Sequence, residues 1–139
     1  MKIDDIYSLM EKINEIQKTV FNISNKSLKK YDLTFSLAKL LMRIGAYNHG
    51  VNQQQLALDL RIHTSAVVIK TDKLAKKGLI IKRNDEEDRR AKIIQITPYG
   101  HALLVLISKE MNELEILLAS HVENYSKEIL SIISINKHV

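Results

Sequence analysis

One short stretch of the sequence, Asp88-Arg89-Arg90, places a carboxylate beside two guanidinium groups in a segment that is otherwise polar. Side chains two residues apart on a β-strand point to the same face, so Asp88 and Arg90 can meet. An exposed ion pair contributes only about 0–1 kcal/mol to stability, so its use would be to aim the arginine. An aimed guanidinium suits the narrow minor groove of DNA, where negative potential is concentrated. Taken alone, the pair is more simply explained as an ordinary surface salt bridge.

The neighbouring acids Asp85, Glu86 and Glu87 argue against a phosphate contact, because carboxylates repel DNA. They must face away from the DNA backbone, or this segment contributes little to binding.

A second candidate set lies on a predicted helix that begins at His63 or Thr64. Three side chains recur at the spacing of one helix face and are expected to point inward: Val67, Thr71 and Leu74. Thr64 and Ser65 fall in the first turn, where hydroxyls and backbone N–H groups suit phosphate. The side chains left to face a DNA groove are Ala66, Val68, Ile69, Lys70 and Lys73.

The aliphatic pair Val68 and Ile69 determines the expected mode of base recognition. Aliphatic side chains pack on thymine methyl groups but cannot make bidentate hydrogen bonds to purines. We therefore expect a site rich in A·T pairs, recognised through methyl contacts and DNA shape. The alternative is a rotated helix in which Val68 and Ile69 belong to the core.

The charge distribution supports a polyanionic partner. Between Arg61 and Lys92 there are ten Lys or Arg against five Asp or Glu, whereas the rest of the chain has eleven of each. All of the net charge of +5 therefore lies in one central block, which attracts nucleic acid through counterion release. A solvated helix face explains the same charges about equally well.

The periodicity around this block predicts a helix-turn-helix followed by a wing. Asn52 is a good N-cap for a helix to Leu60, and the next helix ends at Lys76-Lys77-Gly78. Together they form a helix-turn-helix over residues 52–77. The period then changes to that of strands, so residues 79–97 are predicted to form a β-hairpin with a charged tip.

The helices on both sides of this centre are unusually apolar. One is expected from about Asp4 to Lys30, and a second from Leu33-Thr34 to residues 48–50. Thr97-Pro98 starts a third, and a final helix carries Val122 and the apolar residues after it. Helices that are apolar almost all round need cover on more than one face, so residues 1–30 and 98–139 are predicted to form a homodimer.

Composition limits the other classes of protein. The 139 residues, 45% hydrophobic and 27% charged, suit a single mainly α domain with a small two- to three-stranded β-wing. Cysteine is absent, and neither an 18-residue apolar run nor a signal-peptide pattern occurs, so we expect a cytoplasmic protein without membrane contact.

The five histidines do not form a metal motif, and no cofactor is expected. They are spread along the chain without ligand spacing at positions 49, 63, 101, 121 and 138. Only His49 and His101 are expected to approach each other. The sequence has no nucleophile elbow, phosphate loop or HExxH motif, so we do not expect an enzyme.

An ordered set of short motifs resembles the MarR family of winged-helix transcription regulators over nearly the whole chain. The matching segments are Asp32-Leu33-Thr34, Gln55-Leu56-Ala57 with Leu60, Val67, Asp72-Lys73-Leu74, Lys77-Gly78-Leu79-Ile80, the stretch from Asp88 to Thr97, and Pro98-Tyr99-Gly100. The stretch ending at Thr97 resembles the wing signature of the family, which favours a wing over an ordinary salt bridge. Val68 and Ile69 depart from the family, which tends to have Ser, Thr or Arg there.

The resemblance implies a dimer whose recognition helices enter successive major grooves of a palindromic operator. It implies that the wing arginines, Arg89 and Arg90, contact DNA, with Asp88 orienting Arg90, and that the first helix and the last two helices pair the subunits. It also implies a ligand cavity between the dimer region and the DNA-binding lobe, for a small aromatic or amphipathic effector. Candidate lining residues are Tyr7, Met10, Phe21, Leu41, Tyr47 and Leu103, which could equally be plain core.

The sequence therefore favours a homodimeric regulator that binds double-stranded DNA. Because members of the family are usually repressors, we expect a repressor whose DNA binding is relieved by a small-molecule effector. The alternative is a winged-helix module that binds protein and not DNA, which the acidic tip and the aliphatic recognition helix would suit.

Overall fold

The computed structural model describes residues 2–88 and 90–137, with side chains through Ser134, so the predictions for Arg89 and His138 lie outside the described residues. The helices are α1 (Ile3–Leu28), the 3-10 helix η1 (Lys29–Tyr31), α2 (Phe35–Gly45), α3 (Gln53–Leu60), α4 (Thr64–Lys76) and α5 (Pro98–Lys137). The strands are β1 (Val51–Asn52), β2 (Ile80–Asn84) and β3 (Lys92–Ile96). The predicted fold class, mainly α with a small β-wing, is confirmed.

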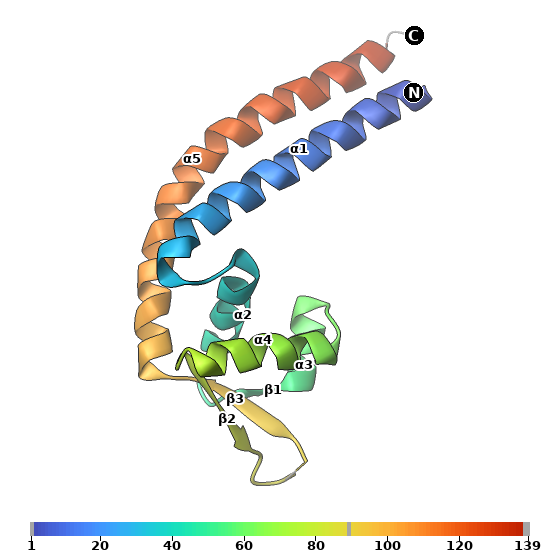
Figure 1. Cartoon of the computed structure of the whole chain (residues 1–139). Coiled ribbons are helices and arrows are strands. Elements are labelled where there is room, and N and C mark those ends of the chain that lie inside the picture. Colours follow the sequence, from blue (N-terminus) through green and yellow to red (C-terminus); the bar gives the residue numbers. More distant parts are fainter. Residues whose placement is uncertain (1, 89, 138–139) are drawn as a thin grey trace.

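The elements form two parts. The helices α1 and α5 run side by side in opposite directions as a long arm, with both ends of the chain at its tip (Figure 1). The other part, here called the DNA lobe, contains α2, α3, α4 and the sheet, and α5 begins beside it.

Local signals in the sequence fix the starts of the short helices. The Thr34 hydroxyl accepts a hydrogen bond from the Leu37 N–H at 3.2 Å, and the Asn52 side chain accepts one from the Gln55 N–H at 2.7 Å. Such caps satisfy N–H groups that have no partner inside the helix. Asn52 is therefore the predicted N-cap of α3, whereas α2 ends at Gly45, a few residues earlier than expected.

The wing is a three-stranded antiparallel sheet in the order β1-β3-β2. Ile80 pairs with Ile96 in the β2–β3 hairpin, and Val51 pairs with Ile94 across β1 and β3. Ile94 and Val51 are buried, so the central strand attaches the wing to the core.

Thr97 joins the wing to α5. Its hydroxyl donates to the Gly78 carbonyl at 2.7 Å and accepts from the Gly100 N–H at 3.0 Å. Gly100 packs against the chain so closely that an added Cβ would lie 2.1 Å from the Leu79 carbonyl oxygen. This close approach explains why glycine follows Pro-Tyr at the start of α5.

The hydrophobic core lies in the DNA lobe and at its junction with the arm. Its fully buried side chains are Leu28, Leu40, Leu41, Ile44, Leu56, Val67, Leu74, Leu79, Ile80, Ile94 and Ile107. They come from every helix and from the wing, so the core holds the recognition helix and the wing in one fixed relation.

The prediction of two helices after Thr97 is wrong, because α5 is one helix from Pro98 to Lys137. The sequence from His101 to Lys137 contains no glycine or proline, so nothing interrupts its backbone hydrogen bonds. A change in the apolar pattern near Val122 was interpreted as a break. In Figure 1 the helix instead bends along its length as it leaves the DNA lobe.

None of the helices described is both long enough and apolar enough to cross a bilayer.

Candidate nucleic-acid interface

The helix α4 has the predicted orientation. Val67, Thr71 and Leu74 are each 0% exposed, and the Thr71 hydroxyl donates to the Val67 carbonyl at 2.7 Å. Ile69 is 59% exposed and Val68 is half-buried at the edge of the inner face. The alternative in which both residues belong to the core is therefore wrong.

Only part of the predicted contact set shares the outward face of α4. At about 100° per residue, Ser65 and Ile69 lie opposite the buried stripe, together with Asp72 and Lys76. Thr64 and Ser65 are exposed at the start of the helix, and Ala66 is half-buried beside them.

The two predicted lysines of α4 differ in position. Lys70 is half-buried on the flank of the helix and lines a hollow with Phe35 and Leu60. Lys73 is exposed one turn after Ile69, so it shares the outward face with Ser65 and Ile69, and it also lines a cavity near the arm. The structure therefore brings Lys73, but not Lys70, together with Ser65 and Ile69.

The predicted ion pair between Asp88 and Arg90 does not form in the part of the chain that the structure describes. Both residues lie in the loop between β2 and β3 and not on a strand, so the alternation of a strand does not apply to them. The Asp88 carboxylate instead accepts the backbone N–H of Arg90 at 3.0 Å. Asp88 therefore shapes the loop, and the Arg90 guanidinium has no carboxylate partner among the described contacts.

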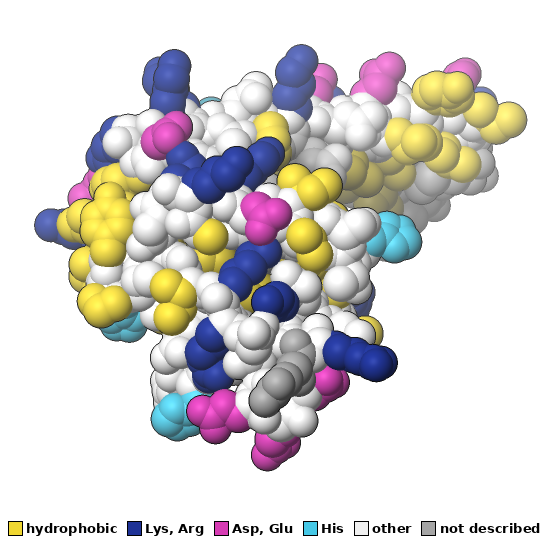
Figure 2. Space-filling view, turned by 60° about the horizontal axis from the view of Figure 1, so that its bottom comes forward, with side chains coloured by type: hydrophobic (Ala, Val, Ile, Leu, Met, Phe, Trp, Pro, Cys, Tyr) yellow, Lys and Arg dark blue, Asp and Glu magenta, His cyan; other side chains and the backbone are white. Residues whose placement is uncertain are grey.

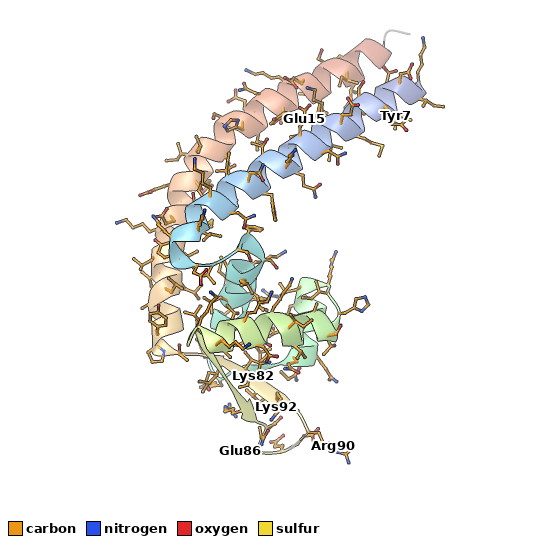
Figure 3. The ribbon with its side chains drawn as sticks, viewed as in Figure 1. Tyr7, Glu15, Lys82, Glu86, Arg90 and Lys92 are labelled. Carbon is orange, nitrogen blue, oxygen red and sulfur yellow. The ribbon has the colours of Figure 1, made fainter. Side chains whose placement is uncertain are left out.

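The acidic tip and Arg90 point in different directions. Glu86 and Arg90 lie on opposite sides of the loop, and Arg90 extends away from the wing (Figure 3). The loop is closed by the Asp85 N–H, which donates to the Ala91 carbonyl at 3.0 Å. The acids can thus face away from a partner that Arg90 reaches, as the sequence required.

Polar contacts that the sequence did not predict attach the wing to the helices. Lys82 of β2 lies 2.6 Å from the Asp72 carboxylate of α4. The Arg83 guanidinium donates to the His49 carbonyl at 3.1 Å, on the turn before β1. These contacts join residues far apart in the chain, and no local pattern could have indicated them.

One carboxylate connects α2 with α3. Asp59 accepts hydrogen bonds from the Arg43 Nε at 3.0 Å, from the Gln55 side-chain amide at 2.8 Å and from the Tyr47 hydroxyl. The Tyr47 hydrogen bond, followed by that of Gln55, lowers the pKa of Asp59, and the carboxylate raises the pKa of Tyr47. Tyr47, predicted to line an effector cavity, therefore holds the first helix of the motif in place.

A large open cleft separates the end of α1 from the end of α4. Its volume is about 970 Å³, and it is lined by Phe21, Asn25, Lys26, Lys29, Asp32, Leu33, Thr34, Leu37, Lys73, Lys76 and Lys77. Five of these residues are lysines and one is an acid. The apolar part of the lining consists of Phe21, Leu33 and Leu37. Lys77 pairs with Asp32 at 2.5 Å, which ties the end of the recognition helix to the turn after η1.

The six residues predicted to line a cavity do not come together. Only Phe21 lines the cleft, whereas Leu41 and Leu103 are in the core. Tyr7 and Met10 are exposed on the distant half of α1, and Figure 3 shows Tyr7 near the tip of the arm. The prediction selected apolar residues, but five of the eleven residues that line the cleft are lysines, which do not indicate a pocket in a sequence.

The arm is held together within one chain by few polar contacts. Lys12 lies 2.9 Å from Glu128, and the hydroxyls of Thr19 and Tyr125 are 3.4 Å apart. Large apolar side chains nevertheless remain exposed on both helices: Ile3, Ile6, Tyr7, Met10, Ile13, Phe21, Val105, Leu106, Ile116, Leu117, Val122 and Leu130. An apolar surface of this extent indicates an interaction site.

The face that carries α4 and the wing is basic. Figure 2 shows Lys and Arg side chains in a band down the middle of this face, with acidic side chains both within the band and at its lower edge. Within residues 2–88 and 90–137, no three His, Asp or Glu side chains converge as a metal site would need.

The paired helices α3 and α4, followed by the hairpin β2–β3 and braced by β1, define a winged helix-turn-helix protein. The MarR family model matches residues 33–92, from the start of the DNA lobe to the first residue of β3. Residues 33–92 are therefore similar to the MarR family, in agreement with the resemblance seen in the sequence.

Known proteins resemble the chain beyond this central domain. The HTH-type transcriptional regulator SarU from Staphylococcus aureus is 25% identical over 114 residues, which are 78% of this chain and 45% of SarU. The chain thus spans about half the length of the curated relatives it matches.

Two solved structures share the fold. The transcriptional regulator BldR from Sulfolobus solfataricus is 27% identical, with a TM-score of 0.71 over 100% of this chain and 99% of BldR. A mutant MarR from E. coli complexed with operator DNA has a TM-score of 0.75 at 19% identity, over 94% of this chain and 99% of that chain.

Proposed function

We propose that this protein is a cytoplasmic transcriptional regulator that binds double-stranded DNA in a sequence-specific manner, and that it acts as a homodimeric repressor relieved by a small effector. The observation that carries the proposal is the arrangement of α4 and the wing. The helix turns Ser65 and Ile69 outward, and the wing extends Arg90 with no carboxylate partner among the described contacts. BldR, 27% identical over the whole chain, is itself a transcriptional regulator.

Each part of this surface has a role in the proposal. Ile69 packs on thymine methyl groups in the major groove, while Thr64 and Ser65 contact phosphates at the start of α4. Arg90 enters the adjacent minor groove, where A·T-rich sequence makes the groove narrow and its potential more negative. Arg89 belongs to the same wing contact in this proposal. Lys70, on the flank of α4, adds long-range attraction and no base contact, whereas Lys73, one turn after Ile69 on the outward face, contacts the DNA with it.

The exposed apolar surface of the arm supports the proposal that the protein is a homodimer. Its exposed apolar side chains lie on both α1 and α5, so a second copy can cover them with the same surface. A two-fold dimer presents two recognition helices to one palindromic operator, and it doubles the number of phosphate contacts.

The cleft between the ends of α1 and α4 supports the proposal that a small effector binds the protein. Lysines around an apolar patch suit an amphipathic anion, whose ring or chain contacts Phe21 and Leu37 while its acid group meets Lys73 or Lys77. Lys77 also holds Asp32, so a bound anion competes for the contact between the recognition helix and the turn after η1. Binding would thereby favour a dimer in which the two α4 helices are wrongly spaced for DNA.

The proposal is tested by enriching duplexes from a random pool and measuring their affinity at several salt concentrations. We expect a palindromic, A·T-rich sequence and an affinity that falls steeply with salt. Arg90→Ala should weaken binding about tenfold and reduce the salt slope by about 1, as the loss of one charged DNA contact does.

Two outcomes would overturn parts of this proposal. If Arg90→Ala binds the enriched duplex as tightly as the parent at physiological salt, the wing does not contact DNA. If the parent enriches no sequence and shows no salt-dependent binding, the protein is a winged-helix module for protein partners, which the exposed Ile69 and Leu58 and the acids of the wing tip would serve.

A further inference from the structure

A small hollow lies where the wing approaches the starts of α3 and α4. Its volume is about 220 Å³, and it is lined by Asn52, Gln53, Gln54, Thr64, Asp88, Arg90, Ala91 and Lys92. Every lining side chain except that of Ala91 is polar or charged. The hollow thus differs from the cleft near the arm, which has an apolar patch.

The hydrogen bonds within the hollow leave its positive charges uncompensated. Two of its oxygen acceptors are engaged by backbone, because Asn52 accepts from the Gln55 N–H at 2.7 Å and one carboxylate oxygen of Asp88 accepts from the Arg90 N–H at 3.0 Å. The two cations Arg90 and Lys92 outnumber the single carboxylate of Asp88. Lys92 donates at 2.5 Å to the neutral amide of Asn84. Neither Arg90 nor Lys92 forms an ion pair with any described carboxylate.

The remaining groups are donors suited to an oxyanion. The amides of Gln53 and Gln54 lie in the first turn of α3, and the Thr64 hydroxyl lies in the first turn of α4. The two cations come from the wing. Neutral donors with two cations against the single carboxylate of Asp88 give the hollow a net positive charge, which fits a singly charged phosphodiester with two non-bridging oxygens to accept these bonds.

We propose that this hollow binds one backbone phosphate of each DNA half-site, at the point where the strand passes from the major groove under α4 to the minor groove under the wing. This inference rests on the proposed function and deepens it, since it adds Gln53, Gln54 and Lys92 to the contact surface. None of these three residues is a DNA contact predicted from the sequence. The phosphate fixes the spacing between α4 and the wing on the duplex and carries no sequence information.

The test uses an enriched duplex in which single phosphates are replaced by neutral methylphosphonates, one position at a time. In the wild-type protein, one linkage per half-site between the two grooves should cost about tenfold in affinity, as the loss of a charge-assisted hydrogen bond does. In Lys92→Gln, the unmodified duplex should bind about tenfold more weakly, and methylphosphonate at that linkage should cost nothing further. Gln54→Ala, an exposed position, should show the same coupling at lower amplitude.

The control is Lys109→Gln, which removes an exposed lysine of α5 and should leave the profile of the wild type unchanged. Thermal melting of each variant verifies its folding. The inference is overturned if methylphosphonate at every linkage costs Lys92→Gln as much as it costs the wild type while both still bind the duplex. If the wild type binds no duplex specifically, the proposed function itself fails and this inference fails with it.

Discussion

The DNA lobe and the arm differ in how completely their apolar side chains are buried within a single chain. In the lobe, α2, α3 and α4 each bury an apolar face, and side-chain caps and the Asp59 hydrogen bonds fix the ends of α2 and α3. In the arm, Ile3 is 74% exposed and Ile116 is 80% exposed, although both lie on long regular helices. The lobe therefore buries its apolar side chains within one chain, whereas the arm exposes an apolar surface of the kind that a second copy covers in a dimer.

The largest expected effect is on the junction between the two parts. Gly100→Ala places a methyl group 2.1 Å from the Leu79 carbonyl oxygen, so α5 must shift away from the wing. We expect a loss of about 3 kcal/mol or more in the free energy of unfolding, measured by urea denaturation. Gly78→Ala is the matched control, because its Cβ meets no atom within 4 Å and only the positive φ of 74° is strained. It should cost only about 1–2 kcal/mol, and equal losses would contradict the predicted clash.

Next in size is the effect of a charge on the arm. Ile116→Asp should convert the dimer into a monomer in analytical ultracentrifugation at micromolar concentration and lower the affinity for a palindromic duplex by about a hundredfold. The secondary structure should be retained, because the lobe does not depend on this position. Glu115→Gln, the exposed neighbour, serves as control. A variant that stays dimeric would show that this part of α5 is not covered by the second copy.

The Asp59 hydrogen bonds should show a pH-dependent effect within the lobe. Because its hydrogen bonds lower the pKa of Asp59 in the folded protein, the carboxylate stabilises the fold at neutral pH. This stabilisation is present above the unfolded pKa near 3.8 and is lost as the pH falls through the lower folded value. Asp59→Asn should therefore melt several degrees below the wild type at pH 7, and the difference should shrink below pH 3.8. A difference that is independent of pH would mean that the charge of Asp59 has no part in holding α3.

The smallest effect on stability should come from the ion pair across the cleft. The Asp32 side chain is 93% exposed, so Lys77→Met should change the free energy of unfolding by less than about 1 kcal/mol. The same variant should bind 1-naphthoate, a simple amphipathic anion, more weakly than the wild type in a thermal-shift titration. Naphthalene methanol, which is uncharged, should give the same thermal shift in the variant and in the wild type. Equal naphthoate shifts in both proteins would remove Lys77 from the proposed effector site.

Short-range patterns predicted most of the lobe. The spacing of Val67, Thr71 and Leu74 predicted which face of α4 is buried, and Asn52 and Gly78 marked helix ends correctly. These features depend on neighbours within a few residues, which is why they can be read from one sequence. The wing hairpin was predicted for the same reason.

The errors have a different origin, in contacts between distant residues or in competition for one group. The cleft depends on Asp32 meeting Lys77, 45 residues away, and on lysines whose role no periodicity reveals. Asp88 was predicted to pair with the Arg90 side chain, but its carboxylate instead accepts a hydrogen bond from the nearer backbone N–H of Arg90. The break predicted within α5 does not occur, because an apolar pattern can shift along a helix without ending it.

The central claim is that the outward face of α4 and the wing contact duplex DNA while the arm does not. The absence of cysteine allows a direct measurement, because a single introduced cysteine can carry an iron chelate that cleaves nearby DNA. Coupled at Ser65→Cys, the chelate should cut the enriched duplex within a few base pairs of each half-site centre, whereas coupled at Arg90→Cys it should cut in the flanks. Coupled at Ser108→Cys on α5, it should give no localised cutting. Localised cutting from position 108 with none from position 65 would contradict the account.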